Sequence, residues 1–136
     1  MQNQSDKYLE MKIQTATPEA LVGILYEGAI RFLKQATRGM DGQDWYVAHS
    51  NIVRAQNIIS ELNVTLDKEK GGDIASNLSK IYTYIHDRLI EANIKKDPNL
   101  VGECIGLLSE LNSAWSKVIK DARGMSTSRE GVVLAG

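Results

Sequence analysis

The sequence is poor in the features that define several large classes of protein. It has one cysteine, Cys104, with no Cys-x-x-Cys pair or Cys/His cluster beside it, so we expect a small buried side chain and a reducing compartment. No stretch approaches the roughly 18 apolar residues of a membrane span. The first residues form neither the basic region nor the apolar core of a secretion signal. We therefore expect a cytoplasmic protein that does not insert into a membrane.

An excess of charge of one sign is also lacking. The 16 basic and 17 acidic residues are spread through the chain and form neither a basic stripe that would neutralise phosphates nor an acidic tail. Nucleic acid is therefore not an expected partner. The 136 residues fit one domain, which is long enough to remove roughly two-thirds of the unfolded chain's surface from water.

What the sequence does contain is helical periodicity, first in the segment that follows Thr17. The threonine hydroxyl can cap a helix, Pro18 suits the first helical position, and Glu19 suits the positive end of the helix dipole. Apolar residues then recur over residues 21–36 in two rows that leave only a narrow polar stripe. We expect a helix that is buried on most of its surface.

Three further segments repeat apolar residues in alternating steps of three and four, the spacing of a helix-bundle seam. They cover residues 45–66, 74–92 and 100–122, and the pair Gly71–Gly72 and the helix-starting Pro98 lie between them. Helices of about 20 residues, each roughly 30 Å long and joined by short loops, predict an all-α fold. The expected architecture is an antiparallel up-down four-helix bundle.

Both ends of the chain fall outside this pattern. We expect a flexible or cap segment at residues 1–16, the bundle at 17–123 and a disordered tail at 124–136. Gly124 is expected to cap the last helix, and the tail is small and polar apart from the apolar residues at 132–134.

Tyr8, Leu9, Met11 and Ile13 form an apolar cluster ahead of the first bundle helix. Their spacing fits either an extended strip or one short helical turn, and both need a groove to lie in. The cluster is too small to form a unit of its own and too apolar to be left in water without cost. We therefore expect it to act as a displaceable cap over part of a binding groove.

The sequence offers no constellation that supports catalysis or metal binding. His49 and His86 lack the Glu-x-x-His pairing of di-iron bundles and the other residues of a metal site. Neither has the lysine and small residues that suit a phosphotransfer histidine, although a histidine phosphotransfer-type signalling bundle is kept as the alternative function. No nucleophile–base pair or glycine-rich phosphate loop occurs. We expect no enzyme, no cofactor and no metal.

The helices carry more apolar surface than the four seams need. The residues off the seams are Val53, Ile58, Tyr82, Tyr84, Ile94, Ile105, Leu107 and Ile119. A wide buried stripe explains any one of them equally well, but together they suggest a groove. Asn51, Gln56 and Asn77 could satisfy the backbone of an incoming chain there, or could simply face solvent.

Three stretches of the sequence resemble one protein family. They are TATPEALVGILYEGAIRFLKQA at 15–36, NIVRAQNIISELNVTLDKEKGGDIASNLSKIYTYIHDRLIEAN at 51–93 and LLSELNSAW at 107–115. The most specific parts are the LD-x-E-x-GG-x-IA-x-NL pattern and the LY-x-GAI pattern. Over nearly all of residues 8–118 the sequence is similar to the flagellar secretion chaperones of the FliS family.

The resemblance implies a helical bundle that binds the disordered C-terminal segment of newly made flagellin, prevents premature polymerisation and presents flagellin to the flagellar export gate, without ATP or metal. It also implies that an N-terminal segment with a tyrosine, here Tyr8, can cover part of the client surface. Asn77, Tyr82 and Tyr84 belong to the most recognisable stretch, and the resemblance implies that they help to hold the client. The predicted partner-binding set is Tyr8, Met11, Ile13, Asn51, Gln56, Ile58, Asn77, Tyr82 and Tyr84, on a monomer or weak homodimer.

Overall fold

Helices make up the regular structure of this chain. The computed structural model describes the backbone of residues 4–135 and the side chains of residues 6–67 and 69–122. Within that part it contains five helices and no strand: α1 (Gln4–Thr15), α2 (Pro18–Asp41), α3 (Trp45–Val64), α4 (Lys68–Lys95) and α5 (Pro98–Ala135). The prediction of an all-α fold is confirmed.

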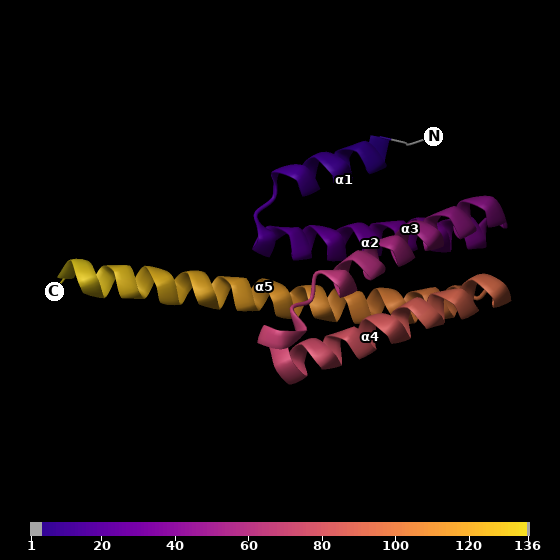
Figure 1. Ribbon diagram of the computed structural model, residues 1–136. Helices are drawn as coiled ribbons and strands as arrows, with labels where there is room; N and C mark the ends of the chain where they lie inside the picture. The colour runs from indigo at the N-terminus through magenta and orange to yellow at the C-terminus, as the bar shows by residue number, and fades with distance from the viewer. Residues whose placement is uncertain (1–3, 136) are drawn as a thin grey trace.

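The helices from α2 to α5 pack around one core. α2 lies against both α3 and α5, and α4 in turn lies against both α3 and α5. The chain reverses direction at each short connection between them, and α5 extends well past the other helices toward the C-terminus (Figure 1). α1 packs on α2, on the side of the molecule away from α4 (Figure 1).

Short polar side chains fix the beginnings of the helices. The Thr17 hydroxyl accepts a hydrogen bond from the Ala20 N–H at 3.3 Å, and Pro18 is the first residue of α2, so the predicted start is confirmed. Asp44 caps α3 with its carboxylate in the same way. α5 begins at Pro98, as the sequence indicates.

A glycine breaks α4 near its beginning. Gly72 has φ 52° and ψ −129°, a left-handed backbone that favours a residue without a side chain, and it separates the first turn of α4 from the rest. The first turn is capped by Asp67, whose carboxylate accepts from the Lys70 N–H at 3.1 Å. The sequence placed the connection at Gly71–Gly72; the structure adds a helical turn before that break.

Four seam positions predicted from periodicity are exposed: Trp45, Ile74, Val118 and Ala122. Trp45 is the first residue of α3, and Ala122 lies beyond Val118 on α5. Ile74 is 74% exposed because it follows directly after the break at Gly72, at the end of the helix pack. Val118 is 56% exposed because α5 has passed the beginning of α2 by that point: the Trp115 indole N–H, one turn earlier, donates to the Glu19 carbonyl. Periodicity indicates which face of a helix is apolar, but not where its neighbour stops.

The helix end predicted at Gly124 is also wrong, because the backbone of α5 continues to Ala135. One glycine costs an exposed helix about 1 kcal/mol relative to alanine and does not by itself terminate it. Side chains beyond Ala122 lie outside the described part. The division into residues 1–16, 17–123 and a disordered 124–136 stays a prediction.

The core takes side chains from all four packed helices. Its largest fully buried members are Leu33, Ile52, Ile59, Leu62, Ile85, Leu89, Val101, Cys104 and Leu108. Cys104 is buried and unpaired, as expected, and burial raises the pKa of its thiol to about 12. The thiol therefore stays protonated and behaves as a small apolar side chain.

A pair of phenols crosses this core. The hydroxyl oxygens of Tyr26 on α2 and Tyr82 on α4 lie 2.5 Å apart, and both side chains are buried. Burial is the main cause that raises the pKa of both hydroxyls. The hydrogen bond satisfies two polar groups that would otherwise be costly to enclose.

Tyr82→Phe should lower the free energy of unfolding by about 1–2 kcal/mol, because the buried Tyr26 hydroxyl loses its partner. Replacing both tyrosines by phenylalanine should recover most of that loss, as measured by chemical denaturation. Since the folded pKa values lie above the ordinary 10.0, wild-type stability should fall as the pH rises past that value, and less so in the double variant. A single variant as stable as wild type would show that the pair contributes nothing.

Candidate partner-binding site

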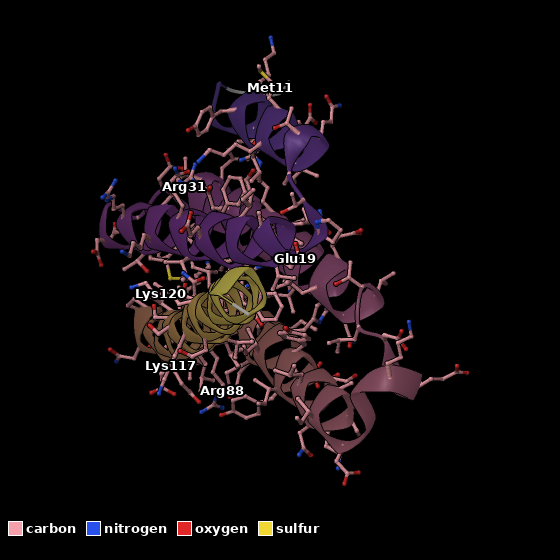
Figure 2. All side chains as sticks on the ribbon, turned by 90° about the vertical axis from the view of Figure 1, so that its left-hand side faces the viewer. Met11, Glu19, Arg31, Arg88, Lys117 and Lys120 are labelled. Atoms are coloured by element: carbon pink, nitrogen blue, oxygen red, sulfur yellow. The ribbon has the colours of Figure 1, made fainter. Side chains whose placement is uncertain are left out.

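The N-terminal cluster forms a helix with two different faces. α1 spans 12 residues, so neither the extended strip nor a single turn describes it. Leu9 is buried and Ile13 packs against the core, whereas Tyr8 and Met11 are 53% and 67% exposed. Figure 2 shows Met11 on the outer side of α1, directed away from α2. One face of α1 therefore covers the molecule and the other faces solvent.

A missing side chain on α2 creates the place where α1 attaches. Gly28 is buried, and a Cβ built there would lie 3.3 Å from Cδ1 of both Leu9 and Ile58. Glycine at this position lets Leu9 from α1 and Ile58 from α3 meet over the backbone of α2. We call the space over Gly28, beside Ile58, that the Leu9 side chain fills the Gly28 slot.

An ion pair holds the beginning of α1 over the same surface. Asp6 Oδ2 lies 3.3 Å from Arg54 Nε on α3, and the Arg54 guanidinium lies 5.9 Å from the centre of the Phe32 ring. Both partners are partly exposed, so the pair contributes at most about 1 kcal/mol. Its position restricts α1 to the side of the molecule where α2 and α3 meet.

These contacts make α1 a weakly held element. A helix of this length is marginal in water by itself, so its structure depends on Leu9, Ile13 and the Asp6–Arg54 pair. Only Ala16 and Thr17 separate it from α2. Its departure would uncover Ile58 and the open side of Gly28.

The predicted polar contacts lie elsewhere. Asn51 is 5% exposed, its Nδ2 donates to the Val47 carbonyl at 2.9 Å, and its buried Oδ1 has no hydrogen-bond partner among the described residues. Gln56 Nε2 donates to the His86 carbonyl at 3.3 Å and so links α3 to α4. Asn77 is exposed on α4.

Tyr84 belongs to a hydrogen-bonded cluster on the outside of α4 and α5, together with Arg88, Glu91 and Glu103. Its hydroxyl donates to one carboxylate oxygen of Glu103, and Arg88 Nε donates to the other at 3.0 Å. The same arginine donates to Glu91 at 2.8 Å, and Figure 2 shows it on the outer side of the molecule. The Tyr84 and Arg88 hydrogen bonds lower the pKa of Glu103, so it stays an acceptor.

The structure therefore divides the predicted set instead of gathering it. Tyr8, Met11 and Ile13 are on α1 and Ile58 is beneath it, whereas Tyr82 is in the core and the remaining members are spread over α3 and α4. The set omits Leu9, Gly28 and the Asp6–Arg54 pair. A glycine in a helical segment gives no apolar signal, and an ion pair between distant segments gives none in a single sequence.

The described part of the chain lacks two other kinds of feature, a metal-binding cluster and a membrane-spanning helix. No group of three or more His, Cys, Asp or Glu side chains could hold a metal ion there. Nor is any of its helices long and apolar enough to cross a membrane. His49 Nδ1 lies 2.7 Å from Asn93 Nδ2, in a contact between α3 and α4.

Comparison with known proteins gives consistent matches. A family model described as Flagellar protein FliS matches residues 1–122. The chain is 32% identical over 123 residues to the flagellar secretion chaperone FliS of Bacillus subtilis (strain 168), covering 90% of this chain and 91% of the relative. It is 36% identical over 111 residues to that of Salmonella typhimurium, covering 81% and 82%. Identity to that of Escherichia coli (strain K12) is 29% over 110 residues, covering 80% and 81%.

The fold is all-helical, and the relatives are named flagellar secretion chaperones, so the matches point to the chaperone class. The chain belongs to the FliS family. The resemblance stated from the sequence is confirmed.

Leu9→Ala should release α1 without unfolding the core, because it empties the Gly28 slot while leaving α2–α5 intact. Amide hydrogen exchange of α1 should accelerate by up to about tenfold, the equivalent of the roughly 1–2 kcal/mol expected to hold it. Met11→Ala is the matched control, since that side chain is exposed on the same helix. Equal exchange in both variants would show that the slot does not hold α1.

Proposed function

We propose that this protein is a cytoplasmic export chaperone for flagellin. It binds the disordered C-terminal segment of flagellin, prevents premature polymerisation and delivers the subunit to the gate of the flagellar type III export apparatus. Membership of the FliS family supports the proposal, as do relatives named flagellar secretion chaperones. The free form is a monomer or weak homodimer, and the chaperone acts by binding, without turnover.

In this proposal α2–α5 form an antiparallel up-down four-helix bundle and α1 is its cap. The packing of α2 and α4 against both α3 and α5 supports the bundle, since each helix then has two neighbours and the core lies between them. The cap is supported by the small set of contacts that attach α1 to the rest. The bundle supplies a rigid surface, and the cap covers part of it when no client is bound.

The observation that carries the proposal is the surface beneath α1. It combines Ile58, the open backbone face of Gly28 and the charged Arg54. Leu9 of α1 lies over Gly28 on the side where Ile58 also approaches, and Asp6 of α1 pairs with Arg54. A client segment with an aliphatic side chain and an acidic group at helical spacing can make the same contacts. Disorder in the free client permits this, because a disordered chain can fold onto the surface it binds.

The histidine phosphotransfer alternative receives no comparable support. Neither His49 nor His86 has the neighbouring lysine and small residues that suit phosphoryl transfer, and the relatives are named as chaperones. Stable label on His49 or His86 after incubation with a phosphorylated receiver domain would reverse this preference.

Binding of flagellin should depend on the C-terminal segment. The protein should co-purify with full-length flagellin and not with flagellin that lacks this segment, because only the disordered segment can fold onto an apolar surface. Titration of the isolated segment should give a strongly negative heat-capacity change and a gain of helix. Equal recovery of both flagellins would overturn the proposed function.

Deleting residues 1–14 should strengthen binding of the isolated flagellin segment by about 1–2 kcal/mol. An intramolecular competitor lowers apparent affinity by the fraction of molecules that it leaves open, and the deletion removes that competitor. The magnitude is modest because few partly buried side chains must offset the ordering of about ten residues.

Isothermal titration of the deletion variant beside full-length Lys7→Ala provides the comparison, since Lys7 is exposed on α1 and the point variant keeps the cap in place. Weaker binding after deletion would mean that α1 is part of the client site. Unchanged affinity with failed export in cells would assign the segment to the export gate instead.

A further inference from the structure

The outer side of α2 carries a short row of cations. Arg31, Lys34 and Arg38 follow one another at steps of three and four, so their side chains leave the helix on one face. Lys34 and Arg38 are exposed and Arg31 is half-buried. Glu27 and Asp41 lie at the two ends of the row, which leaves a positive stretch of about 10 Å between them.

The fold itself does not use these charges. Among the described side chains the ion pairs are Asp6–Arg54, His86–Asp87, Arg88–Glu91, Arg88–Glu103 and Lys95–Glu91, and none of them involves α2. An exposed cation without a partner costs little while water surrounds it, but it attracts an acidic group that approaches. The row on α2 is therefore available to an anion from outside.

The alignment of α2 with α5 shows what lies beside the row. A Cβ built on Gly23 would lie 3.9 Å from Asn112 Oδ1, so these two residues are at the same level. α2 and α5 run in opposite directions, because the chain reverses at each of the three connections between them (Figure 1). Moving forward from Gly23 to Lys34 therefore corresponds to moving back along α5 from Asn112 to about Val101.

The edge of α5 at this level carries no charge toward α2. In steps of three and four back from Asn112, the residues on that edge are Ser109, Ile105, Gly102 and Pro98. Gly102 is exposed, and a Cβ built there would meet no atom within 4 Å. No side chain at this glycine therefore stands between the cations of α2 and an incoming segment.

The acidic residues of the same turns of α5 are engaged elsewhere. Glu103 accepts hydrogen bonds from Tyr84 and Arg88 of α4, on the other side of α5. Asp97 accepts from the Asn99 N–H at 2.9 Å, at the beginning of the helix. We call the surface formed by Arg31, Lys34 and Arg38 together with Gly102, Ile105 and Ser109 the α2–α5 face.

This face is separate from the surface beneath α1. α1 attaches over Gly28 and beside Arg54, and within the described residues it packs on α2 but not on α5. Figure 2 shows Arg31 of α2 and Lys117 and Lys120 of α5 on one side of the molecule, so cations continue along α5 beyond the beginning of α2. The α2–α5 face is therefore open whether α1 is docked or released.

The spacing of the cations matches a helix with an acidic edge. Carboxylates three and four residues apart on a helix form a row with the same spacing as the row on α2. The open side of Gly102 lets the backbone of such a helix come close to α5. Nucleic acid fits less well, because its phosphates form a long continuous track, whereas Glu27 and Asp41 limit the positive stretch at both ends.

We infer that the α2–α5 face docks an acidic helical segment of a partner protein. Carboxylates of that segment pair with Arg31, Lys34 and Arg38, and its backbone passes over Gly102. The docking does not depend on the proposed function. If flagellin occupies the surface beneath α1, however, the partner and flagellin can be bound at the same time.

Reversal of two exposed charges tests the inference. The probe is a labelled alanine-rich helical peptide of about 18 residues with glutamates along one face. In Lys34→Glu/Arg38→Glu its affinity, measured by fluorescence anisotropy at low salt, should fall by about fivefold to tenfold, since attraction becomes repulsion. The matched control is Lys70→Glu/Lys80→Glu, which reverses two exposed lysines of α4 and changes the net charge equally. The control should lose less than about twofold.

A charge-swapped peptide keeps the test independent of folding defects. With lysines in place of the glutamates, the peptide should bind Lys34→Glu/Arg38→Glu more tightly than wild type, a gain that a misfolded variant would not give. Raising the salt concentration from about 0.05 M to about 1 M should weaken the wild-type complex and remove the difference between the variants. Saturation with the isolated flagellin segment should leave the affinity for the glutamate peptide unchanged.

Three results would overturn the inference: a control variant that loses as much affinity as Lys34→Glu/Arg38→Glu, wild type that prefers an uncharged alanine–glutamine peptide or binds both peptides equally, or displacement of the glutamate peptide by the flagellin segment. A DNA or RNA oligonucleotide that binds more tightly than the peptide, with the same sensitivity to the variants, would assign the face to nucleic acid instead. Failure of wild type to bind flagellin would contradict the proposed function and leave the peptide results intact.

Discussion

The arrangement depends on how closely other helices can approach α2. This helix has to meet α3 and α5 in the core while also carrying α1 outside. At Gly39 an added Cβ would lie 2.9 Å from the Ala48 backbone nitrogen, so α3 begins against a bare stretch of α2 backbone. At Gly28 the same absence of a side chain accommodates Leu9 and Ile58 together. The two glycines of α2 thus determine how closely α1 and α3 approach its backbone.

Sequence periodicity was sufficient for the main helices because each of them buries one continuous face. Alternating steps of three and four identified α3, α4 and α5, and the capping residue Thr17 identified the beginning of α2. The same signal failed at Ile74 and Val118, where a helix outruns its neighbours. An apolar pattern is a property of one segment, whereas burial also requires a neighbouring helix at the same level along the axis.

The candidate site was harder to predict because its parts come from different segments. Tyr8, Leu9, Met11 and Ile13 suggested a cap by their apolar character, but only the structure shows that Leu9 is the buried member of the cluster. Gly28 and Arg54 carry no periodic signal of their own. The sequence gives no signal that singles out Asn63, and only the folded structure shows that its amide oxygen is enclosed. These features follow from tertiary packing, which a single sequence does not specify.

The connection between α1 and α2 has a consequence for how a bound chain leaves. Because only Ala16 and Thr17 join the two helices, α1 stays tethered near the surface it has vacated, at an effective concentration on the order of millimolar. In the proposed function, a client helix that lifts from the Gly28 slot competes with the tethered α1, which can reoccupy the slot before that helix returns. On that proposal the tether favours release of the client over its rebinding.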